Sequence, residues 1–211
     1  MFKLISATPS PYARKVRIAL AEKGLPFELV TEVPWDSTTA TPKHNPLEKL
    51  PVLILNDGSS VYESNYILQY LELKFPKTPL LPPDVDGILH ARRLEVLCDG
   101  VCDAVVLTFF ERMRPADQRS VEWQARQRRK IEGGVREMAR LIGKRSFAVG
   151  DRFGLGDIAV GTALGYLAVR FAEFSWPSLY PNLKTYSAAL EARPSFKSSV
   201  PVPQTITDKV V

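Results

Sequence analysis

The chain has 211 residues, of which 45% are hydrophobic and 24% charged, and its formal net charge is +5 at pH 7. These values are typical of a soluble globular protein of one or two domains with a sizeable core. No secretory signal is recognisable at the N-terminus, and the longest nearly apolar stretch, residues 158–169, is too short to cross a bilayer. We therefore expect a cytoplasmic protein without a membrane partner.

The positions of the basic residues, cysteines and histidines indicate structural roles rather than nucleic-acid or metal binding. The basic run over residues 126–130 (RQRRK) is typical of a solvated helix face, and no zinc-finger spacing or RNP signature supports nucleic-acid binding. Cys98 and Cys102, four residues apart in a helical pattern, are expected to be buried as small hydrophobes. Because His44 and His90 are far apart in sequence, we expect no metal site.

The first third of the chain alternates strand and helix patterns. In chain order, the patterns predict strands over residues 2–5, 27–31, 49–55 and 60–62 and helices over residues 11–23 and 64–75. A loop rich in Thr, Pro and Ser over residues 34–46 contains Trp35, and Asn56-Asp57-Gly58-Ser59 predicts a hairpin turn. This order predicts a mixed sheet with helices on its faces.

Four prolines within residues 76–83 (PKTPLLPP) predict a linker, after which the pattern is helical. Helices are expected over residues 86–112, 120–142, 155–174 and 183–192, followed by an extended tail. The helix expected over residues 155–174 is nearly all apolar and belongs at the centre of a bundle. In the helix expected over residues 120–142, the tandem Gly133-Gly134 indicates a bend or close packing. We expect an α/β domain over residues 1–78 and an all-α domain over residues 86–200.

Four local features of the α/β part can carry chemistry. Pro11 suits the first position of a helix, which places Ser10 at its N-cap, where free N–H groups favour a carboxylate, a phosphate or a thiolate. The others are Lys49-Leu50-Pro51-Val52 at a strand entrance, Glu63-Ser64 at the next helix start, and Arg14-Lys15. Ser64 is itself a candidate N-cap, and we expect Arg14 and Lys15 to be solvated.

The segments SPYARKVRIALAEKG, NPLEKLPVL and VYESNYILQYL, followed by a proline linker and a helical domain, resemble the cytosolic glutathione transferases of the serine type, bacterial-like. The resemblance covers essentially the whole chain. It implies a thioredoxin-like N-terminal domain with a mixed four-stranded sheet, an all-α C-terminal domain and a homodimer. It also implies glutathione as co-substrate, a small apolar electrophile and no metal.

The resemblance assigns glutathione binding to Lys49, Leu50, Pro51, Val52, Glu63 and Ser64. Pro51 matches the family's cis-proline. The backbone of Val52 would pair with the cysteinyl part of glutathione like an added strand. Glu63 and Ser64 would hold the γ-glutamyl group, and Lys49 is a weaker candidate for the glycyl end.

Ser10 matches the family's activating position. Its hydroxyl would donate a hydrogen bond to the glutathione sulfur and lower the thiol pKa from about 8.5, which stabilises the attacking thiolate. Serine in place of cysteine disfavours thiol–disulfide exchange. A plain N-cap is the alternative role for Ser10, and Tyr12 is the fallback donor. The implied electrophile site lies between the domains, with Tyr12, Trp35, Phe109, Phe110 and Trp123 as candidate walls.

The chain departs from the family pattern at one helix start. Gly154 stands where the family has Ser or Thr three residues before Asp157, so half of a capping box is absent.

Two other functions are alternatives to the transferase. A glutathione-dependent isomerase or dehalogenase resembling the zeta class is a second hypothesis, although of that class's Ser-Ser-Cys run only Ser10 is kept. The third is a non-catalytic relative that acts by binding, as the stringent starvation proteins bind RNA polymerase.

Overall fold

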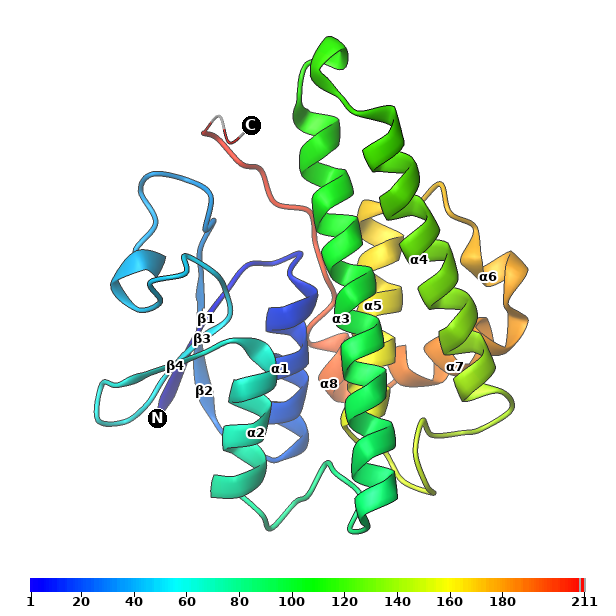
Figure 1. The fold of residues 1–211 in the computed structure, drawn as a ribbon. Helices are drawn as coiled ribbons and strands as arrows, with labels where there is room; N and C mark the ends of the chain where they lie inside the picture. The colour runs from blue at the N-terminus through cyan, green and yellow to red at the C-terminus, as the bar shows by residue number, and fades with distance from the viewer. Residues whose placement is uncertain (209, 211) are drawn as a thin grey trace.

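The computed structural model describes residues 1–208 and 210, which form a sheet-containing part followed by a bundle of helices (Figure 1). The sheet-containing part consists of β1 (Phe2–Ser6), α1 (Pro11–Glu22), β2 (Phe27–Thr31), η1 (Thr41–Lys43), β3 (Val52–Ile54), β4 (Ser60–Tyr62) and α2 (Ser64–Lys74). The helical part consists of α3 (Val85–Met113), η2 (Ala116–Gln118), α4 (Val121–Ile142), α5 (Leu155–Arg170), α6 (Trp176–Leu179), α7 (Pro181–Glu191) and α8 (Pro194–Lys197).

The sheet has four strands in the order β2-β1-β3-β4. β1 runs parallel to β2 and antiparallel to β3, and β4 is antiparallel to β3, so the sheet is mixed as predicted. In Figure 1, α1 and α2 lie between the sheet and the long helix α3. A thioredoxin-like part followed by an all-α part is therefore confirmed.

Helix α1 illustrates how local sequence produces this arrangement. Ser10 caps its first turn, Pro11 occupies the first helical position, and Gly24 follows the helix with φ of 65°, a left-handed conformation that glycine adopts without steric cost. Its apolar face, including Val16 and Leu20, is wholly buried. The amphipathic pattern thus fixes both the limits of the helix and the side that packs.

The helical part is built around α5, as its composition predicted. Residues 155–164 of this helix are all buried, and it packs against both α1 and α3. One continuous apolar cluster contains Leu4 of β1, Leu20 of α1 and Leu164 of α5. The two parts therefore share their core, and the domain limits 1–78 and 86–200 stay predictions.

Two glycines permit close packing of neighbouring backbone and side chains. A Cβ at Gly134 would lie 2.2 Å from Cγ2 of Val101, so the tandem glycines mark close packing of α4 on α3. A Cβ at Gly154 would lie 2.4 Å from the Leu80 carbonyl oxygen. The residue that departs from the capping pattern thus makes room for the linker, while its N–H still donates to Asp157 at 2.8 Å.

The structure corrects several predicted limits. The strand expected over residues 49–55 is reduced to β3, and Pro51 before it has no N–H for the ladder. The Leu50–Pro51 bond is cis, as the resemblance implied. The helix expected to reach residue 174 ends at Arg170, and the one expected from residue 183 begins at Pro181. The short helices α6 and α8 were not predicted. In the described ranges, no helix has the length and apolarity needed to cross a membrane.

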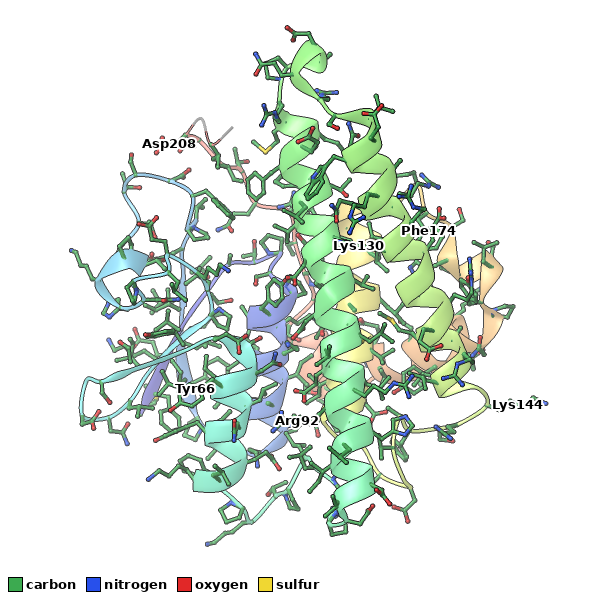
Figure 2. The ribbon with its side chains drawn as sticks, viewed as in Figure 1. Tyr66, Arg92, Lys130, Lys144, Phe174 and Asp208 are labelled. Carbon is green, nitrogen blue, oxygen red and sulfur yellow. The ribbon has the colours of Figure 1, made fainter. Side chains whose placement is uncertain are left out.

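The tail after α8 lies outside helices and strands and returns to the sheet-containing part. Thr8 Oγ1 donates to the carbonyl of Val202 at 2.9 Å, and Gln204 Nε2 donates to the carbonyl of Glu32 at 3.2 Å. The backbone N–H of Ser37 donates to Asp208, which Figure 2 shows near the loop that follows β2. The tail therefore borders the space between the loop after β2 and the helical part.

Candidate functional site

A cavity of about 460 Å³ opens between the start of α1, the loop after β2, the start of α2, α3 and the end of α5. Among the residues singled out in the sequence, its walls include Ser10, Tyr12, Trp35, Lys49, Leu50, Glu63, Ser64, Phe109 and Phe110. These residues come from five separate segments of the chain. Pro51, Val52 and Trp123 do not line it.

Ser10 is the N-cap of α1 and also a wall of the cavity. Its Oγ accepts the backbone N–H of Ala13 at 3.2 Å. This bond uses a lone pair of the hydroxyl and leaves its hydrogen free, because a hydroxyl both accepts and donates. The capping role and a donor role toward a bound anion are therefore compatible in the same side chain.

Glu63, rather than Ser64, is the N-cap of α2, which corrects the prediction for Ser64. The Glu63 carboxylate accepts the N–H groups of Asn65 at 3.1 Å and Tyr66 at 3.2 Å, and Ser64 is the first helical residue. Glu63 has φ of 72°, a conformation that costs a non-glycine residue about 1–3 kcal/mol. The strained turn places a carboxylate and the helix start together at the cavity wall.

The strand entrance presents Leu50 rather than Val52 to the cavity. Val52 pairs with Ile5 of β1 and with Tyr62 of β4, so it lies inside the sheet with a neighbouring strand on either side. Leu50 precedes the first paired residue of β3 and lines the cavity. Backbone pairing with a bound ligand, expected at Val52, is thus available at Leu50.

Tyr12 is engaged with another residue of the cavity wall. Its hydroxyl donates to the carboxylate of Asp103 on α3. Burial, the neighbouring Cys102 and this hydrogen bond raise the pKa of Tyr12 well above its usual value. The phenol therefore stays protonated with its hydrogen directed at Asp103, and the fallback role as donor to a thiolate, which stays a prediction, would require this bond to break.

Aromatic side chains form the cavity wall near the C-terminal end of α3. The ring centroids of Trp35 and Phe110 are 4.3 Å apart, and those of Phe109 and Phe110 are 5.2 Å apart. Arg170, at the end of α5, places its guanidinium carbon 4.0 Å from the centroid of Phe109. Trp123 instead begins α4, which lies on the other side of α3 from the sheet in Figure 1.

Arg14 and Lys15 are buried, contrary to the expectation that they would be solvated; each exposes 2% of its side chain. Arg14 pairs with Glu191 of α7 at 2.7 Å, and Lys15 pairs with Asp99 of α3 at 2.7 Å. Charged side chains are withdrawn from water only when they are paired. These two therefore fasten α1 to the helical part, close to Ser10.

The two cysteines do not contribute a reactive thiol. Cys98 and Cys102 are buried and free, as expected, and burial raises the pKa of both thiols far above the usual range. They remain protonated and inert. Across residues 1–208 and 210, no group of three or more His, Cys, Asp or Glu residues is arranged to hold a metal ion.

Sequence patterns did not single out several other wall residues, among them Asn65, Asp99, Asp103, Tyr166, Arg170, Gln204 and Ile206. The acidic ones lie one helical turn apart on α3 at positions 99 and 103, and Val106 and Phe109 continue the same face. That spacing is a visible signal of a shared helix face. Arg170 and the tail residues offered no comparable signal.

Two family models match the chain on either side of the linker. The Glutathione S-transferase, N-terminal domain model matches residues 9–74, and the Glutathione S-transferase, C-terminal domain model matches residues 121–189. The uncharacterized GST-like protein YibF of Escherichia coli K12 is 34% identical over 94% of this chain and 98% of its own length. This chain belongs to the glutathione S-transferase family.

Solved structures of other glutathione S-transferases share the whole fold. The enzyme from Methylobacterium radiotolerans, in complex with glutathione sulfonate, is 72% identical, with a TM-score of 0.99 over 100% of this chain and 99% of that one. The one from Methylobacillus flagellatus, with glutathione bound, is 42% identical, with a TM-score of 0.91 over 96% of this chain and 100% of that one. These similarities show the family and the fold.

Proposed function

We propose that this chain is a glutathione transferase in which Ser10 stabilises the glutathione thiolate for attack on an apolar electrophile. The observation that carries the proposal is the Ser10 hydroxyl, which accepts from Ala13 at 3.2 Å while lining the cavity. The glutathione-bound relatives support the ligand, and the aromatic wall of Trp35, Phe109 and Phe110 supports an apolar second substrate.

The proposed placement of glutathione follows the cavity wall. Leu50 offers its backbone to the cysteinyl part, because Val52 is paired within the sheet. Glu63 and the helix start at Ser64 hold the ammonium and carboxylate of the γ-glutamyl group. Lys49, exposed at the cavity, is the candidate for the glycyl carboxylate. This orientation directs the sulfur toward Ser10.

The chemical step needs an ionised thiol at neutral pH. An unperturbed thiol has a pKa of about 8.5, and each unit by which it falls corresponds to about 1.4 kcal/mol of preferential binding of the thiolate. A hydrogen bond from Ser10 to the sulfur supplies stabilisation of this order. The thiol proton passes to solvent, sulfur bonds to the electrophilic carbon, and a leaving group such as chloride departs with its bonding pair.

The decisive test compares Ser10→Ala with a second capping serine. Ser120 caps α4 by accepting the N–H of Trp123 at 3.1 Å, a geometry that matches Ser10, but it does not line the cavity. Ser10→Ala is expected to lower the rate with chlorodinitrobenzene about 10- to 100-fold, whereas Ser120→Ala should lose only cap stability, about 1 kcal/mol. Equal rates for Ser10→Ala and wild type would leave Ser10 as a cap only.

Calorimetry with glutathione separates the remaining alternatives. Failure of the wild type to bind millimolar glutathione would contradict the transferase. Binding without conjugation would favour the non-catalytic hypothesis, and binding with turnover of a cis-enone but not of chlorodinitrobenzene would favour the isomerase. The homodimer expected from the family, with a cytoplasmic location, belongs to the same proposal and is checked by sedimentation of the purified chain and by cell fractionation.

A further inference from the structure

Arg170 is a half-buried residue of the cavity wall that, unlike Arg14 and Arg193, pairs with no carboxylate among the described residues. Arg14 pairs with Glu191 at 2.7 Å and Arg193 pairs with Glu22 at 2.8 Å. Arg170 takes part in none of the ion pairs found among the described residues, and its buried Nε has no hydrogen-bond partner there. A buried donor without a partner costs about 1–3 kcal/mol. Such a group at a cavity wall is a candidate ligand contact.

The surroundings of Arg170 hold its guanidinium in place but do not neutralise it. The guanidinium carbon lies 4.0 Å from the ring centroid of Phe109, within range of a cation–π contact. Tyr166, one turn earlier on α5, also lines the cavity. Burial and the nearby Cys102 raise the pKa of Tyr166, and Arg170 only partly opposes this, so its hydroxyl stays neutral. The charge is oriented and remains unmatched by these neighbours.

The walls of the cavity change character along α3. Asp99 accepts a hydrogen bond from Asn65 at the start of α2, where the ammonium of a γ-glutamyl group is proposed to bind, and Asp103 accepts one from Tyr12 at the start of α1. Two turns further, Phe109 and Phe110 form the aromatic wall, with Trp35 against Phe110 at 4.3 Å. Arg170 lies against Phe109 at this aromatic end. The cavity therefore has carboxylates toward one end and a cation at the other.

We propose that Arg170 determines specificity for electrophiles that carry a carboxylate on an aromatic or otherwise unsaturated body. This inference rests on the proposed glutathione transferase function and names the class of its second substrate. The apolar body packs against Trp35 and the phenylalanines, and the carboxylate pairs with Arg170. A planar guanidinium binds a carboxylate through two parallel hydrogen bonds, and stacking on Phe109 orients it before the substrate arrives.

The test uses two glutathione conjugates that differ by one carboxylate, S-benzylglutathione and S-(para-carboxybenzyl)glutathione, with calorimetry as the readout. No turnover is needed. The wild type should bind the carboxylated conjugate about tenfold more tightly. Arg170→Gln should abolish that preference while changing the affinity for S-benzylglutathione by less than about threefold. Arg170→Lys should keep part of the preference, because lysine keeps the positive charge but cannot form two parallel hydrogen bonds to the carboxylate. Arg129→Gln, at an exposed position of α4, is the matched control and should behave as wild type.

Each outcome decides the matter. Binding of both conjugates by the wild type with equal affinity overturns the assignment of Arg170 and leaves the glutathione site intact. Equal losses for both conjugates in Arg170→Gln also overturn it, because they indicate a structural role. If neither conjugate binds, the proposed transferase site itself fails. The wild-type comparison needs no variant, so it decides the question even if a variant does not fold.

Discussion

The ammonium nitrogen of Lys15 lies 2.7 Å from the carboxylate of Asp99, and the two side chains expose only 2% and 16% of their surface. Lys15 also donates to Asn65 at 3.0 Å, and the Asn65 amide donates to Asp99 at 2.8 Å. These three residues come from α1, α3 and α2. Because Asn65 and Asp99 line the cavity, the cluster fixes the position of its wall as well as the packing of the three helices.

We expect Lys15→Met to destabilise the protein by about 3 kcal/mol, because removing one partner of a buried pair leaves the other charge uncompensated. Urea unfolding at pH 7 measures the loss. Lys3→Met is the control: Lys3 pairs with Glu28 at 3.2 Å, but the side chains expose 56% and 46% of their surface, so the loss should stay below about 1 kcal/mol. Equal losses in the two variants would contradict a structural role for the buried pair.

The adjacent glycines of α4 should respond to alanine in opposite directions. A Cβ at Gly134 would meet Val101 at 2.2 Å, whereas one at Gly133 would meet nothing within 4 Å. We expect Gly134→Ala to destabilise the protein by about 1–3 kcal/mol through overpacking, and Gly133→Ala to stabilise it by about 0.5–1 kcal/mol through helix propensity. Thermal unfolding of both variants checks this. A gain in stability for Gly134→Ala would show that α3 and α4 can move apart at little cost.

Glu22 should make stability depend on pH in the acid range. Burial opposes ionisation of its carboxyl, but hydrogen bonds from Arg193 and Ser195 outweigh that effect and hold its pKa below the usual 4.5. At a pH between the folded and the unfolded pKa of Glu22, the unfolded chain binds more protons than the folded one. The free energy of unfolding therefore rises with pH in this range. The contribution of Glu22 is fully present above pH 4.5 and is lost as pH falls through the lower, folded pKa.

Glu22→Gln is therefore expected to be less stable than wild type by about 1–2 kcal/mol at pH 7. The gap should close as the pH is lowered through the acid range, because a protonated Glu22 resembles glutamine. Denaturant unfolding across that range measures it, with exposed Glu28→Gln as a control that should stay close to wild type throughout. A gap that does not change with pH would assign the loss to packing rather than to ionisation.

Local patterns predicted the elements of the fold well, because helix caps and amphipathic faces depend on neighbouring residues. Ser10 and Pro11 begin α1 as expected, and the apolar composition of α5 correctly placed it at the centre. The limits of β3 were wrong because the ladder begins only after Pro51. Arg14 and Lys15 were wrongly expected in solvent, because Glu191 and Asp99, which pair with them, are 177 and 84 residues away.

The sequence by itself determined which family the chain resembles and which helix start carries the serine, since both depend on short contiguous motifs. The tertiary structure decided which residues face one cavity. It brought Arg170 and Gln204 to the wall together with the predicted Leu50, and it left Val52 and Trp123 outside. The reason is physical: a cavity is defined by distances between elements, and these follow from how α1, α3 and α5 pack, which no local pattern in the chain encodes.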